Sequence, residues 1–98
     1  MKELWTAQVH LLTPPNVVGN TKAYTNIVSW ADDPEDYSVT ITRLLEERDW
    51  FVLDVELCRR VAECKVIPEE LASQIERAKL QSSSCILGTL HYYPSRPA

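Results

Sequence analysis

The chain has 98 residues, a length typical of one folded domain, and 45% of them are hydrophobic, so we expect a single α/β domain over residues 1–98. Ten Lys and Arg residues against fourteen Asp and Glu residues give a formal net charge of −4, which argues against nucleic acid or an anionic membrane as a partner. With two glycines, the chain cannot build the Gly-rich loops that hold phosphates or dinucleotides, and no cofactor is expected.

The amino-terminal segment and the cysteines indicate a reducing compartment. Residues 1–6 lack the apolar run of a signal peptide or spanning helix. The three cysteines, Cys58, Cys64 and Cys85, are odd in number and match no common zinc or disulfide spacing. We therefore expect a cytoplasmic protein with reduced, packed thiols.

Two segments near the amino terminus have the pattern of paired strands. Between residues 4 and 12, apolar and polar residues alternate with the period of a half-buried strand. Prolines and a Gly-Asn pair within residues 13–20 favour a chain reversal, and residues 23–30 are rich in β-branched and aromatic side chains. The sequence predicts an antiparallel hairpin with a long loop.

A helix is predicted to begin at Asp33. Its carboxylate can cap free amides, Pro34 suits the first helical position, and the acids that follow complement the helix dipole. Tyr37, Ile41, Leu44 and Leu45 recur with helical spacing, so the helix is expected to continue to about residue 48. The β-branched run of residues 39–42 also permits a strand here, but the cap and the apolar stripe favour the helix.

The second half of the chain predicts strand, helix and strand. Residues 50–57 alternate, with Phe51, Leu53, Val55 and Leu57 expected to face the core. Residues 68–79 form a second helix with cationic residues in its last turn, and residues 85–93 form a final strand.

This order, ββαβαβ, predicts an α+β fold of the ferredoxin-like kind: a two-layer sandwich in which both helices cover one face of a four-stranded mixed sheet. Residues 24–30 and 88–94 resemble signatures of small bacterial domains that carry no assigned activity. That resemblance implies no site residues.

If both helices cover one face, the side chains on the reverse face become the functional candidates. The pattern of residues 23–30 leaves open which of its sides faces outward. The candidates for the open face are His10, Tyr24, Trp30, Asp54, Glu56, His91 and Tyr93.

These candidate residues can simply be solvated surface side chains, and two functional interpretations are possible besides that one. His10, His91 and Asp54 have the donor types of a two-His, one-carboxylate metal site or an acid and base pair, but the spacing does not require one. Aromatic rings on an open sheet could also bind RNA, although acids on the same face argue against it. Cys58, which precedes Arg59 and Arg60, is the cysteine with the most electropositive setting, and packing is still the preferred interpretation.

We therefore expect a non-catalytic interaction or regulatory module whose open sheet face packs on a second copy or another protein, with Val17 and Val18 of the loop as a second contact. The alternatives are a small-molecule-binding or enzymatic domain with a polar pocket on that face, and a small acidic inhibitor or immunity-type protein. No catalytic residue and no metal ligand is assigned.

Overall fold

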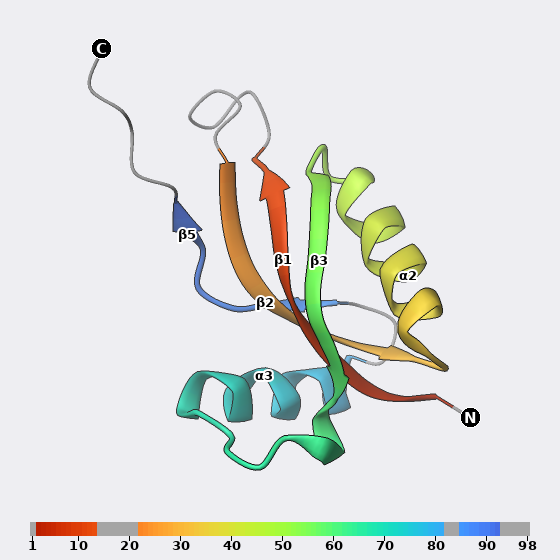
Figure 1. Cartoon of the computed structure of the whole chain (residues 1–98), viewed down its shortest axis with the longest axis vertical. Coiled ribbons are helices and arrows are strands. Elements are labelled where there is room, and N and C mark those ends of the chain that lie inside the picture. Colours follow the sequence, from red (N-terminus) through yellow and green to blue (C-terminus); the bar gives the residue numbers. More distant parts are fainter. Residues whose placement is uncertain (1, 14–21, 82–84, 93–98) are drawn as a thin grey trace.

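A computed structural model describes residues 2–13, 22–81 and 85–92 of the chain (Figure 1). Its elements, in chain order, are β1 (Glu3–Leu12), β2 (Lys22–Ala31), α2 (Pro34–Glu46), β3 (Phe51–Arg60), a 3-10 turn η1 (Val61–Glu63), α3 (Glu69–Leu80), β4 (Ile86–Leu87) and β5 (His91–Tyr92). The fold is α+β, as predicted, with an antiparallel sheet and two helices among these residues.

The predicted hairpin forms the centre of the sheet. β1 and β2 pair antiparallel along their whole length, from Glu3 opposite Ala31 to Leu12 opposite Lys22. The strand order is β3-β1-β2-β4, with β5 also on β2. All strand pairs among the described residues are antiparallel, so the expectation of a mixed sheet is wrong.

α2 begins where the sequence predicts. Asp33 adopts an extended conformation and its Oδ1 accepts a hydrogen bond from the backbone N–H of Asp36 at 2.7 Å. Tyr37, Ile41 and Leu45 are buried against the sheet residues Trp5, Ala7, Val9 and Leu11, which form one row of β1. The β-branched run lies within the helix because this apolar stripe and the cap outweigh its low helix propensity.

The expectation that both helices cover one face is wrong. α3 buries Leu71, Ile75 and Ala78 in a separate cluster that contains Val28, whereas α2 packs on the cluster that contains Ile27. Neighbouring residues of a strand point to opposite sides, so the two helices lie on opposite faces of β2. α3 lies across one end of the sheet only, and elsewhere the arrangement remains the two layers of sheet and α2 (Figure 1).

The alternation predicted for β3 is also wrong, although the strand itself is confirmed. Its pairing with β1 shifts register twice, and the residues that pack on the α2 core are spaced by three: Val52, Val55 and Cys58. Each bulge inserts one unpaired residue into β3. Beyond the bulge, side chains that would have faced the core point to the opposite face of the sheet. Leu57, one of the residues expected in the core, has a φ of 56° and is 71% exposed.

The final predicted strand is interrupted. Ile86 and Leu87 pair with β2 opposite Val28 and Ile27, and His91 and Tyr92 pair with it further along. Gly88 lies between the two short strands, where its backbone N–H donates to the carbonyl of Asn26 at 2.9 Å. A Cβ at this position would meet the carboxylate end of Glu70, a flexible side chain that can move aside, and would lie 3.3 Å from the carbonyl oxygen of Asn26, so Gly88 fits a tight but adjustable site beside α3.

Candidate interaction surface

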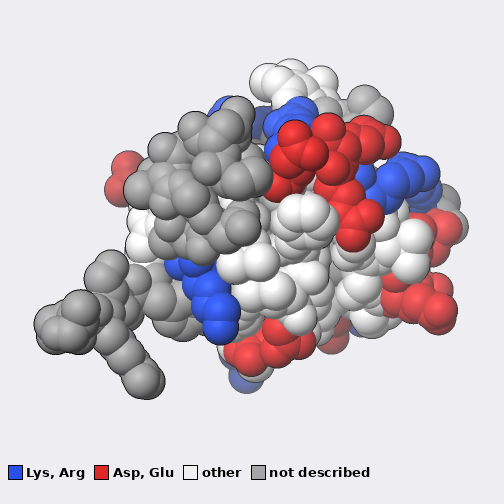
Figure 2. Space-filling view, turned by 90° about the horizontal axis from the view of Figure 1, so that it is seen from above, with Lys and Arg blue, Asp and Glu red and all other residues white. Residues whose placement is uncertain are grey.

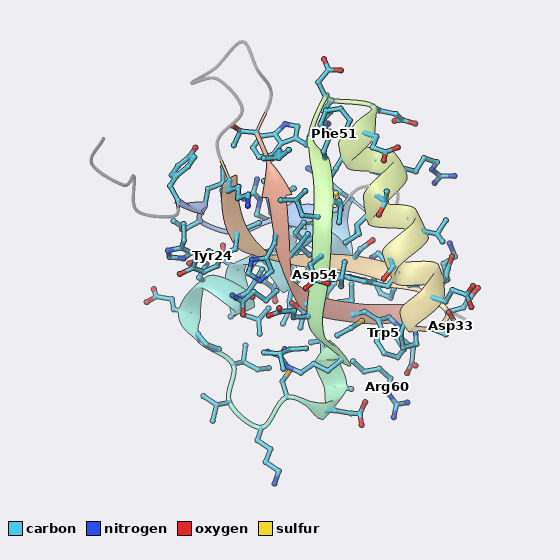
Figure 3. All side chains as sticks on the ribbon, turned by 45° about the horizontal axis from the view of Figure 1, so that its top comes forward. Trp5, Tyr24, Asp33, Phe51, Asp54 and Arg60 are labelled. Atoms are coloured by element: carbon cyan, nitrogen blue, oxygen red, sulfur yellow. The ribbon has the colours of Figure 1, made fainter. Side chains whose placement is uncertain are left out.

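Five of the candidate residues share the part of the reverse face that α3 leaves uncovered. The register places Asp54 opposite His10, His10 opposite Tyr24, and Tyr24 opposite His91, so these side chains run across four strands. Glu56 is opposite Gln8, one step along the same face. Figure 3 shows Tyr24 and Asp54 at separate positions across this sheet. We call Asp54, Glu56, His10, Tyr24 and His91 the polar row.

The rings of the polar row contact one another. Tyr24 stacks on His91 with ring centroids 5.0 Å apart and an interplanar angle of 22°, and its other neighbour His10 has its centroid at 5.8 Å. Nε2 of His10 lies 3.4 Å from Oε2 of Glu56, whose side chain is 50% exposed, while that of His10 is 18% exposed. When His10 is protonated, this contact is an ion pair at the surface.

Two candidates do not join the row. Trp30 is on the same face but at the end covered by α3, where its indole Nε1 donates to the carbonyl oxygen of Ala78 at 2.9 Å. Its role is to anchor the carboxyl-terminal end of α3. Tyr93, and the loop residues Val17 and Val18, lie outside the described residues.

Three exposed apolar side chains that the sequence did not predict lie along β3, the strand that also carries Asp54 and Glu56 of the polar row. Phe51, Leu53 and Leu57, expected in the core, are 51%, 48% and 71% exposed and all belong to β3. Phe51 is opposite Leu12, which places it on the face of the polar row. The three residues are called the β3 patch. One sequence signal could have indicated this exposure. Val52, Val55 and Cys58 recur every third residue, and when these three face the core, Phe51, Leu53 and Leu57 are left outside it.

The outer edge of β3 pairs with no strand among residues 2–13, 22–81 and 85–92. Such an edge can add a further strand, but this one is obstructed. The N–H of Val55 donates to Oδ1 of Asp54 at 2.9 Å, and Nη1 of Arg59 donates to the carbonyl oxygen of Leu57 at 2.9 Å. With the two bulges, these bonds favour contact through side chains over strand addition.

Charges of both signs lie along β3. Asp54 and Glu56 are acidic and exposed, and Arg59, also exposed, follows on the same strand. The two ends of the strand, marked by Phe51 and Arg60, are well separated (Figure 3). Along the strand, the apolar side chains of the β3 patch therefore lie among charges of both signs. Seen from above the view of Figure 1, the molecule also shows a cluster of acidic side chains next to uncharged surface (Figure 2).

The described residues contain no group of three or more His, Cys, Asp or Glu side chains placed to hold a metal ion. His10 and His91 are separated by Tyr24, which holds the two imidazoles on either side of its ring. The two-His, one-carboxylate arrangement is therefore not formed by His10, His91 and Asp54.

Cys58 lacks the features of an activated nucleophile. Burial raises the pKa of its thiol, and the opposing effect of the neighbouring Arg59 is smaller. Its packing against the α2 core supports the structural interpretation of this cysteine. All three thiols are free.

Comparisons of the chain with protein-family models, with curated proteins and with solved structures found no match. In the part of the chain that the structure describes, neither helix has the length and apolarity needed to cross a membrane. What the protein does is therefore inferred from its own residues.

Proposed function

We propose that the protein is a non-catalytic interaction module that self-associates through the β3 patch, with the polar row at the border of the contact. The observation that carries this proposal is the exposure of Phe51, Leu53 and Leu57 on one strand of the sheet. Full burial of a Leu or Phe side chain is worth about 1.5–3 kcal/mol, so exposure of three such side chains together is a cost that a partner surface removes.

A second copy is the partner that the charges favour. Glu56 and Arg59 lie on either side of Leu57 in the same strand. A two-fold axis runs two identical strands in opposite directions, so the acid of one copy lies near the base of the other. The contact is then self-complementary about Leu57, with the two Glu56–Arg59 pairs beside it and with Leu53 and Phe51 further along the strand.

Apolar-to-polar variants test the surface. Leu53→Gln and Leu57→Asn remove exposed apolar groups, and asparagine tolerates the positive φ of position 57. Leu80→Gln is the matched control, because Leu80 is 85% exposed but belongs to α3. In sedimentation velocity over a concentration series, the natural chain and Leu80→Gln should dimerise, whereas Leu53→Gln and Leu57→Asn should remain monomeric.

Charge exchange tests the two-fold arrangement. Arg59→Glu alone and Glu56→Lys alone each place like charges together across the axis and should weaken the dimer. Mixing the two variants should restore association, because the heterodimer again pairs opposite charges at both positions. If the natural chain remains monomeric at the highest concentration in sedimentation velocity, the proposal is wrong. If the mixture of Arg59→Glu and Glu56→Lys associates no more tightly than either variant alone, the two-fold pairing is contradicted.

The stacked rings support a second candidate function, the binding of a small planar ligand on the polar row. His91 is exposed and already stacks on Tyr24 with one face of its ring, and planar groups can stack on the other face. Titration with planar heterocyclic fragments, followed by the NMR resonances of the His10 and His91 rings, tests it. Unchanged resonances at saturating fragment, compared with a Tyr24→Leu control, would remove this candidate.

A further inference from the structure

A cleft lies at the end of the sheet remote from the polar row, between β1, η1 and α3. It has a volume of about 480 Å³, within the range of about 300–1,000 Å³ typical of small-molecule sites. Its apolar wall consists of Leu4, Trp30, Val61, Ala62, Ile67 and Ile75. These side chains come from several elements, so the hollow is built by the tertiary fold and not by one segment.

The charged residues of the cleft are mainly cationic, although the chain as a whole is acidic. Lys2, Glu3, Arg60 and Lys79 contribute to its lining. The guanidinium of Arg60 is already engaged, because its Nε lies 2.8 Å from Oε1 of Glu63 and its Nη1 lies 3.7 Å from Oε2 of Glu3. The hydrogen bond from Arg60 holds the pKa of the Glu63 carboxyl below its usual range, so this pair stays charged.

Two ammonium groups remain for a ligand. Within residues 2–13, 22–81 and 85–92, no carboxylate is within ion-pair distance of Lys2 or Lys79. Lys79 is in the last turn of α3 and Lys2 precedes β1, so the two cations approach the cleft from different elements. An apolar wall with cations at its margin matches a molecule that has an apolar body and an anionic head.

We propose that this cleft binds a small amphipathic carboxylate, whose hydrocarbon chain packs on Leu4, Trp30 and Ile75 and whose carboxylate is held by Lys2 and Lys79. None of Phe51, Leu53 and Leu57 lines the cleft, and this proposal does not require self-association. The aliphatic stems of the lysines extend the apolar wall, and their ammonium groups supply the selection for a negative head group.

Ligands that share one chain and differ in head group test the charge selection. The full-length chain is titrated with decanoate, 1-decanol and decylammonium, all below the concentrations at which they form micelles. Two residues that line the cleft serve as reporters: Trp30, which contributes to the tryptophan fluorescence together with Trp5 and Trp50, and Cys64, whose rate of alkylation is measured. Decanoate should change the fluorescence saturably and slow alkylation of Cys64, with weaker effects from decanol and the weakest from decylammonium.

Variants locate the site. Lys79→Gln should weaken decanoate binding by about fivefold, the effect of losing one exposed ion pair, and Lys2→Gln should act similarly. Lys22→Gln is the matched control, because Lys22 is at the far end of β2. Ala62→Phe should fill the cleft and abolish binding, with the circular dichroism spectrum reporting an intact fold. Equal binding of decanol would identify an uncharged occupant and overturn the proposal. Equal binding of decylammonium, absence of saturable decanoate binding, or equal affinities in Lys79→Gln and Lys22→Gln would also overturn it.

Discussion

The side chain of Gln74, which is 3% exposed, donates a hydrogen bond from Nε2 to the carbonyl oxygen of Asn26 at 2.9 Å. The same Nε2 donates to the carbonyl oxygen of Ile86 at 3.0 Å. One amide of α3 therefore holds both β2 and β4 at the point where the helix crosses the sheet. Buried polar groups of this kind are costly to leave without partners.

Replacement of Gln74 should destabilise the fold through these carbonyls. Gln74→Met keeps the volume but removes the donor, and should lower the free energy of unfolding by about 1–3 kcal/mol. Gln74→Glu should cost more, because it places a carboxylate against two carbonyl oxygens. Urea denaturation measures both, with Ser73→Ala, at an exposed neighbouring position, as the control. Equal stability of Gln74→Met and the natural chain would contradict this role.

Tyr37 should make stability depend on alkaline pH. Its hydroxyl donates to the carbonyl oxygen of Ile27 at 2.6 Å, and burial raises the pKa of the phenol well above its usual range. The folded chain holds this proton more tightly than the unfolded chain, so the stabilisation is complete below the unfolded pKa of about 10 and decreases as the pH rises above it.

Urea denaturation at a series of pH values separates this effect. Tyr37→Phe should be less stable at neutral pH by about 0.5–1.5 kcal/mol, for the lost hydrogen bond. Above pH of about 10 its free energy of unfolding should fall less steeply than that of the natural chain. Tyr92→Phe, at a position that is 49% exposed, should keep the natural slope. Identical slopes in all three proteins would refute the assignment.

The cap at Asp33 should contribute measurably to α2. Asp33→Ala removes the acceptor of the Asp36 N–H and should lower the free energy of unfolding by about 0.5–2 kcal/mol. Asp33→Asn keeps an acceptor oxygen at the same position, so it should restore most of the loss. Thermal denaturation compares the stabilities of the two variants. If Asp33→Ala is as stable as Asp33→Asn, the capping role of Asp33 is contradicted.

The half-buried thiols should react slowly at neutral pH. Burial raises the pKa of Cys58 and of Cys85, so the thiolate fraction of each is smaller than in an unfolded chain at the same pH. Their contribution to stability is complete below the unfolded pKa and is lost as pH rises through the folded one.

Single-cysteine variants measure this directly. Iodoacetamide should label Cys58 or Cys85 more slowly in the folded protein than in urea, and the rate should increase towards alkaline pH. The same variants in urea provide the reference rate. Labelling of folded Cys58 at neutral pH faster than in urea would indicate an activated thiol and contradict the packing role.

Local signals were sufficient for most of the elements. The helix over Pro34–Glu46 was predicted because its cap, its first-turn proline and its apolar stripe are all encoded within a few residues. The pairing of β1 with β2 was predicted for the same reason, since a hairpin joins neighbours in sequence. Strand alternation proposed His10, Asp54, Glu56 and His91 for one face but left the outward side of residues 23–30 open, and the strand register is what places Tyr24 between His10 and His91.

The face of the sheet on which the β3 side chains and α3 lie could not be predicted from such local signals. Bulges in β3 depend on how it meets β1, and their effect is to expose Leu53 and Leu57 where a regular alternation would bury them. The side on which α3 packs depends on the path of residues 61–68, which have no strong periodicity of their own. One hint was available, because Ile27 and Val28 are adjacent apolar residues, a pattern of burial on both faces.

The sequence by itself determined the acidic charge, the helix cap and the central hairpin, because each of these is encoded in composition or short-range spacing. Only the tertiary structure decided that the helices lie on opposite faces, that Trp30 is covered by α3, and that apolar residues of β3 face outward. The physical reason is that face and register are set by contacts between segments distant in sequence, and a single inserted residue reverses them.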